Sequence, residues 1–187
     1  MDKPTCSLRW IGSDEPHLDD PFVFSQGRVH IGVYGGNTNA GADKNEDGAV
    51  AWSDDNGEWE FSMIIDGHNS SESVRLLMDE IGTHQSEIEA ILCQPVSQVF
   101  KHLQQYVVDL LASLQTTSVR GESSCLVVAR KDCYLWWMNV GDCVLYLFHP
   151  DYAKFDQYAV NQRSFFEWIG EVNSFSEPVP CYTTGMN

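Results

Sequence analysis

The stretch from Ala49 to Asp66, AVAWSDDNGEWEFSMIID, decides the fold at the centre of the chain because it holds two alternating apolar runs around Asn56-Gly57. Asn-Gly between such runs is the strongest short-range signal for a β-hairpin. A two-residue turn at Asn56-Gly57 also fixes which residues of the two strands face each other. On the apolar face the facing pairs are then Val50 with Met63 and Trp52 with Phe61. The stretch therefore predicts a hairpin with one face in the core.

The same register places Asp47 opposite Asp66, with Cβ atoms about 4.5–5.5 Å apart. Two like charges at that separation are destabilising unless a shared proton or a hard divalent cation lies between them. The next pair on this face is Ala49 with Ile64, so the surroundings of the acids are small and apolar, which strengthens their electrostatic interaction. Asp47 and Asp66 are therefore a candidate cation site.

Two helices are predicted after the hairpin. The first runs from Ser70 to Ile81; Asn69 can cap it, and Glu72 stands three residues on, as in a capping box. The second runs from Gln94 to Leu114, where apolar residues recur every three or four positions. We expect both apolar stripes to pack against the core.

The remaining segments have β-type or irregular patterns. The first two dozen residues, with three prolines and an acidic run, indicate irregular structure; Arg28 to Tyr34 is predicted as a strand and Gly35 to Gly41 as a loop. Three apolar runs, SSCLVVAR, CYLWWMNV and CVLYLFH (residues 123–130, 133–140 and 143–149), predict an antiparallel meander with turns at Lys131-Asp132 and Gly141-Asp142. This order of elements predicts an α+β domain with helices on the outside of the sheet.

Composition restricts the class of protein. The 187 residues are 43% hydrophobic and 12% aromatic, enough to bury the core of one domain, which excludes a disordered chain. With 11 basic and 27 acidic residues the net charge is −16, so nucleic acid and anionic membranes are poor partners. No leader or membrane span is evident in the sequence. The six cysteines show no zinc-ligand spacing, and we expect a cytoplasmic protein with reduced thiols.

The acidic segment before the hairpin allows a second interpretation. Asp43-x-Asn45-x-Asp47-Gly48 matches the opening of an EF-hand calcium loop. That loop requires flanking helices and a bidentate Glu at position 12, whereas Asp54 holds that position and both flanking patterns are β-type. A calcium-binding domain is therefore the less favoured alternative.

Three blocks resemble, in order and approximate spacing, those of metal-dependent protein phosphatases of type 2C. They are Asn45-Glu46-Asp47, Asp66-Gly67-His68 and Asn139-Val140-Gly141-Asp142, and the resemblance runs from about Gly41 to Phe148. It implies an antiparallel β-sandwich flanked by helix pairs, and two Mg²⁺ or Mn²⁺ ions that activate a water for the hydrolysis of phosphoserine and phosphothreonine. The expected partner is a phosphoprotein substrate.

The resemblance also assigns roles to residues. Asp66 would bridge the two metals, Asp47 would ligate one of them, the Gly67 carbonyl would supply an oxygen, and Glu46 would hold metal-bound water. Asp142 matches a position that can ligate a third metal, although an Asp is equally suited to the tight turn there.

His68 matches the general acid of this family, which protonates the departing alkoxide; an imidazole suits that role because its pKa lies near neutrality.

The chain departs from the family at several positions. The family carries an arginine shortly before its first block, where this chain has Ala42, Asp43 and Lys44; Lys44 offers the substrate phosphate a point charge but no bidentate fork. Two later aspartates of the family have no counterpart after Asp142. We therefore expect residues 1–187 to be a single, incomplete phosphatase-like domain with weak metal binding, since affinity follows the number of charged ligands.

These observations favour a metal-dependent phosphoprotein phosphatase, and we expect the activity of this chain to be impaired. The main alternative is a catalytically inactive, phosphatase-like module that binds phosphoproteins.

Overall fold

The computed structural model describes residues 6–114, 118–176 and 182–187. Its centre is the hairpin expected from the sequence, formed by β4 (Gly48–Ser53) and β5 (Trp59–His68). The register is confirmed: Val50 faces Met63 and Trp52 faces Phe61. The side chains on this face are buried, with Trp52 and Phe61 stacked at 4.8 Å between ring centroids.

The predicted two-residue turn is wrong, although the register is right. The Asp54 N–H bonds the Trp59 carbonyl at 3.3 Å, so the loop spans the residues between them. The Asp54 carboxylate accepts hydrogen bonds from the backbone N–H groups of Asn56, Glu58 and Trp59 at 3.2, 2.6 and 3.1 Å. Because this longer loop is centred on the same Asn56-Gly57 bond, the facing pairs do not change.

A seven-stranded antiparallel sheet extends from the hairpin in both directions, in the order β1-β4-β5-β6-β7-β9, with β8 also paired to β6. The other strands are β1 (Cys6–Ile11), β6 (Glu122–Lys131), β7 (Tyr134–Val140), β8 (Ile169–Gly170) and β9 (Thr183–Met186). The sheet and its helices confirm the α+β class.

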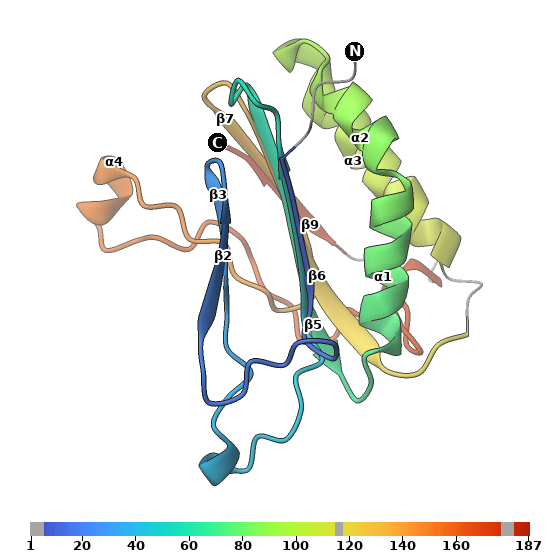
Figure 1. Cartoon of the computed structure of the whole chain (residues 1–187). Coiled ribbons are helices and arrows are strands. Elements are labelled where there is room, and N and C mark those ends of the chain that lie inside the picture. The colour runs from blue at the N-terminus through green and yellow to red at the C-terminus, as the bar shows by residue number, and fades with distance from the viewer. Residues whose placement is uncertain (1–5, 115–117, 177–181) are drawn as a thin grey trace.

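Three helices cover one face of the sheet (Figure 1): α1 (Glu72–Thr83), α2 (Gln85–Leu92) and α3 (Val96–Ser113). The first and last confirm the two predicted helices, and α2 was not predicted. The expected cap at Asn69 is wrong: Asn69 has φ 70° and donates to Glu122 Oε2 at 3.1 Å, so it belongs to the turn before the helix. Within the described ranges, no helix combines the length and apolar character that a membrane crossing requires.

A two-stranded ribbon, β2 (Phe22–Gln26) and β3 (Val29–Val33), lies on the opposite side of the sheet from the helices (Figure 1). It packs on the sheet through a small cluster of Trp10, Val33 and Ala49. In the described part of the chain this ribbon is the only second sheet, so the expected sandwich of two full sheets is not formed there.

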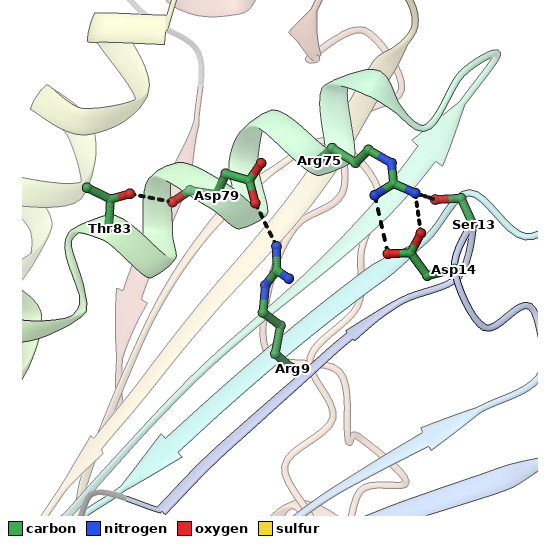
Figure 2. Close-up of polar contacts among 6 residues, drawn as sticks. All are labelled: Arg9, Ser13, Asp14, Arg75, Asp79 and Thr83. Atoms are coloured by element: carbon green, nitrogen blue, oxygen red, sulfur yellow. Dashed lines mark hydrogen bonds and ion pairs between the residues drawn. The ribbon is translucent and has the colours of Figure 1, made fainter.

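The N-terminal segment was predicted to be irregular, but residues 6–11 form β1, the edge strand beside β4. Figure 2 shows how polar contacts tie this edge to α1. Arg9 Nη2 lies 2.7 Å from Asp79 Oδ1, and Arg75 pairs with Asp14 and donates to Ser13 Oγ at 2.9 Å. These long-range partners are invisible in the local pattern of prolines and acids.

The prediction of a third meander strand at residues 143–149 is also wrong. This segment forms one isolated bridge, Tyr146 with Ala159, and the edge of β7 is paired with β9 instead. Asn161 fixes its extended path by accepting from the Leu145 N–H at 2.7 Å and donating to the Cys143 carbonyl at 2.8 Å. A short helix, α4 (Pro150–Ala153), follows.

Candidate active site

The two candidate aspartates lie at the same end of the hairpin. The β4–β5 ladder ends with Gly48 opposite Ile65, so Asp47 and Asp66 are the next residues on the two strands. The Gly67 N–H donates to Asp47 Oδ1 at 3.2 Å, which joins the two strands beyond the last ladder pair. The sequence register therefore predicted the meeting of these carboxylates.

Both aspartates line a cavity of about 340 Å³ between the sheet and β3. Apolar side chains, among them Trp10, Ile31 and Ile64, form much of its wall. Such walls reduce the local dielectric and strengthen charge–charge interactions in the cavity. A cation placed here would gain more from each carboxylate than it would on an open surface.

The pKa values of both carboxyl groups are raised. For Asp47 burial is the main cause; the charge of Glu46 adds to it, and the hydrogen bond from Gly67 opposes it. Asp66 is still partly exposed, but its partial burial raises its pKa, repulsion from Asp47 and Asp142 raises it further, and His68 acts in the opposite direction. The anionic pair is thus strained, and a proton or a cation would relieve it.

Glycine is required where α1 meets this end of the sheet. A Cβ at Gly67 would lie 2.4 Å from the Glu46 carbonyl oxygen and 2.7 Å from Val74 Cγ2. A Cβ at Gly48 would lie 2.8 Å from the other methyl of Val74. The two glycines let the helix and the segment before β4 approach closely, which fixes the position of the Asp47 backbone.

Asn45 holds the segment that carries Glu46 and Asp47. Its buried amide donates to the Pro16 carbonyl at 3.1 Å and accepts from the Asp47 N–H at 3.1 Å. The Asp47 carbonyl in turn accepts from the Gly12 N–H at 2.8 Å. This structural role of Asn45 was not predicted, although its position directly before two candidate acids indicates that it could orient them.

Glu46 and Lys44, which were assigned different roles, bind each other. Lys44 Nζ lies 2.7 Å from Glu46 Oε2, and the Glu46 side chain is only 16% exposed. This pair neutralises the carboxylate expected to hold water and occupies the ammonium expected to contact the substrate phosphate. Substrate or metal would have to displace that contact for either role.

His68 lies at the exposed end of β5, where its ring stacks on Trp168 with 6.1 Å between centroids. The backbone N–H of Trp168 donates to Ser174 Oγ at 2.9 Å, which holds the segment that carries the indole. The contact with Trp168 was not predicted, because no local sequence pattern connects residue 168 with the end of β5.

Asp142 follows the turn at Gly141, which has φ 92° and approaches Ser124 too closely for any side chain. Asp142 raises the pKa of Asp66 and so lies within electrostatic reach of it. The next residue, Cys143, lines the cavity of the two aspartates and was not predicted there. Burial raises the pKa of its thiol to about 11, against an opposing hydrogen bond with Ser124.

The donor chemistry fits a hard cation better than a soft one. Asp47 and Asp66 offer oxygen atoms, which Mg²⁺ and Mn²⁺ prefer, and the neighbouring thiol is held protonated. Among the residues that the structure describes, no group of three or more His, Cys, Asp or Glu side chains is arranged to hold a metal ion. The described residues therefore offer two protein ligands, with Asp142 nearby.

The calcium-loop pattern starts at Asp43, in the connection between β3 and β4, and continues into β4. The flanking helices that an EF-hand requires are strands here, so the EF-hand interpretation is wrong.

No family profile matches this chain, and no curated protein sequence matches it either. The geometry of the site and the resemblance of its short motifs are therefore what a functional assignment rests on.

Proposed function

We propose that the protein is a cytoplasmic, metal-dependent phosphoprotein phosphatase that resembles type 2C enzymes in its short motifs. It would hydrolyse phosphoserine and phosphothreonine with Mg²⁺ or Mn²⁺. The observation that carries the proposal is the pair Asp47 and Asp66, which meet in one cavity with raised pKa values. Placing like charges together costs stability, and binding of a divalent cation is the function that compensates for it.

Bound Mg²⁺ or Mn²⁺ would lower the pKa of a water and neutralise charge on the phosphoryl group. The chain's own residues have distinct tasks in this scheme. Asp47 and Asp66 hold the cation, and the Gly67 N–H orients the Asp47 carboxylate. His68 would donate a proton to the departing seryl or threonyl oxygen, with its ring oriented by stacking on Trp168.

A second candidate is a phosphatase-like module that binds phosphoproteins without hydrolysing them. The specific observation in its favour is the ion pair between Lys44 and Glu46. It partly neutralises one carboxylate of the site and leaves two unpaired carboxylates in the cavity wall, and metal affinity falls with the number of charged ligands.

The deciding experiment combines Mn²⁺ calorimetry with hydrolysis of two substrates, nitrophenyl phosphate and a phosphoserine peptide. Asp66→Asn should lose Mn²⁺ binding and turnover of both substrates. His68→Ala should keep Mn²⁺ binding and lose about 10²–10⁴-fold in rate on the peptide. Its loss on nitrophenyl phosphate should be much smaller, because that leaving group departs without protonation.

The outcomes separate the candidates. Mn²⁺ binding with no turnover of either substrate would favour the binding module. Equal loss of Mn²⁺ binding in Asp66→Asn and His68→Ala would contradict the division of roles, and no Mn²⁺ binding by the unmodified chain would contradict the proposal.

A further inference from the structure

A second and larger cavity, of about 560 Å³, opens on the same face of the sheet. Its polar lining comes from Arg28 and His30 beside the ribbon turn, from Glu60 and Ser62 on β5, and from Arg130 on β6. Val29, Val128 and Leu135 complete an apolar floor. Nothing in the proposed chemistry uses this cavity.

The two cavities follow one another along the same two strands. On the ribbon, residues 28–30 (the end of its turn and the start of β3) line the larger cavity, and residues 31–32 line the smaller. On β5, Glu60 and Ser62 line the larger cavity, and Ile64 and Asp66 line the smaller. On the ribbon and on β5 the lining residues of one cavity directly follow those of the other, so the two cavities adjoin, and together they are called the trough here. Figure 1 shows the ribbon on the side of the sheet away from the helices.

The ends of this trough carry opposite charge. Asp47 and Asp66 occupy one end, whereas Arg28, Arg130 and Glu60 lie at the other, where Glu60 offsets one of the two guanidinium charges. Arg130 is fully engaged: it pairs with Glu60 and donates to the backbone carbonyl of Gly57 at 2.6 Å. Its charge is thus compensated within the protein.

Arg28 is not compensated in this way. Its guanidinium packs over Gly57, where a Cβ would come within 2.6 Å of Arg28 Cζ. Arg28 has no hydrogen bond or ion pair to any residue in the described ranges. In a chain with 11 basic and 27 acidic residues, an uncompensated guanidinium in a cavity of ligand size is a specific feature. Its planar fork suits a carboxylate or a phosphate.

We propose that the trough binds an extended phosphopeptide, with its phosphate at the cation that Asp47 and Asp66 would hold and an acidic side chain at Arg28. This inference rests on the proposed function and names its substrate class. From Glu60 to Asp66 the strand spans about six residues, or about 20 Å at roughly 3.3 Å per residue. The acidic residue of the peptide therefore lies about six positions from the phosphorylated one.

The test uses two labelled phosphoserine peptides that differ only about six residues from the phosphoserine, on both sides, with glutamate in one and glutamine in the other. Fluorescence anisotropy at fixed ionic strength, with Mn²⁺ present, measures their binding. The glutamate peptide should bind about fivefold more tightly, as expected for one exposed guanidinium–carboxylate pair. Arg28→Ala should abolish that preference.

Arg163→Ala is the matched control, because it removes another exposed guanidinium, one that packs over Phe165. It should leave the fivefold preference unchanged. Equal binding of the two peptides, or equal effects of the two substitutions, would overturn the inference.

Hydrolysis of nitrophenyl phosphate by the unmodified chain reports on the proposed function separately. Hydrolysis without an Arg28-dependent preference would overturn only the trough inference. An Arg28-dependent preference without hydrolysis would support the trough as a peptide-binding site and contradict the proposed reaction.

Discussion

The two faces of β5 differ in what they do. Phe61, Met63 and Ile65 point to the helices and are buried, whereas Ile64 and Asp66 point to the ribbon and stay exposed. Strand side chains alternate between faces, so one strand serves both environments. Apolar burial on the helix face offsets the conformational entropy lost on folding. The ribbon face can therefore hold charges that lower the stability of the fold. The candidate site therefore lies on the face of β5 whose side chains contribute less to the stability of the fold.

The first test of this contrast is truncation on each face. Phe61→Ala should lower the free energy of unfolding by about 3–5 kcal/mol, because Phe61 is fully buried against the helices. Ile64→Ala, on a side chain that is 43% exposed, should cost less than about 1 kcal/mol. Urea denaturation of both variants measures the difference. Equal losses would contradict the division between the two faces.

The second test concerns the close approach at the end of β5. Gly67→Ala should cost about 1–3 kcal/mol, because its methyl would overlap the Glu46 carbonyl oxygen and Val74. The same substitution at Gly32 on β3 meets no atom within 4 Å and should be neutral or slightly stabilising. Thermal unfolding of both variants checks this pair, and a destabilised Gly32→Ala would show that the ribbon is packed more tightly than its contacts indicate.

The face covered by helices was the part that sequence could predict. Alternation between Val50 and Trp52, and between Phe61 and Met63, fixes both the strand register and the buried face. The same register, predicted from a turn centred on Asn56-Gly57, placed Asp47 opposite Asp66, and it held because the longer loop has the same centre. Helical periodicity likewise located α1 and α3.

The predictions that were wrong or absent concern segments whose structure depends on partners distant in sequence. The strand β1 forms because β4 offers a free edge, and residues 143–149 stay out of the sheet because β9 occupies the edge of β7. Trp168 reaches His68 through the same kind of distant contact. A local sequence pattern does not determine which of several segments pairs with a given strand edge.

The third test probes the cost of the acidic pair. Because the folded state raises the pKa of Asp66, it binds that proton more tightly than the unfolded chain does. The anionic form therefore destabilises the fold as the pH rises through the folded pKa. With metal removed by a chelator, Asp66→Asn should stabilise the protein at pH 7 by a few tenths to about 1 kcal/mol.

That gain should disappear below the unfolded aspartate pKa of 3.8, where both states are protonated. Asp55→Asn, in the loop at the other end of the hairpin, is the control for removing a charge. Denaturant midpoints measured at several pH values decide the point. A gain that does not depend on pH would show that repulsion is not its cause.

The smallest effect is expected at the surface link between β1 and α1. Arg9 and Asp79 are 2.7 Å apart, but their side chains are 47% and 74% exposed, so water and salt screen the pair (Figure 2). A double-mutant cycle with Arg9→Ala and Asp79→Ala should give a coupling energy of about 0.2–1 kcal/mol. The coupling should fall as salt is raised from low to about 1 M, where the Debye length is roughly 3 Å. A larger, salt-independent coupling would mean that this contact fixes the edge strand, and that β1 owes its place to the ion pair more than to its pairing with β4.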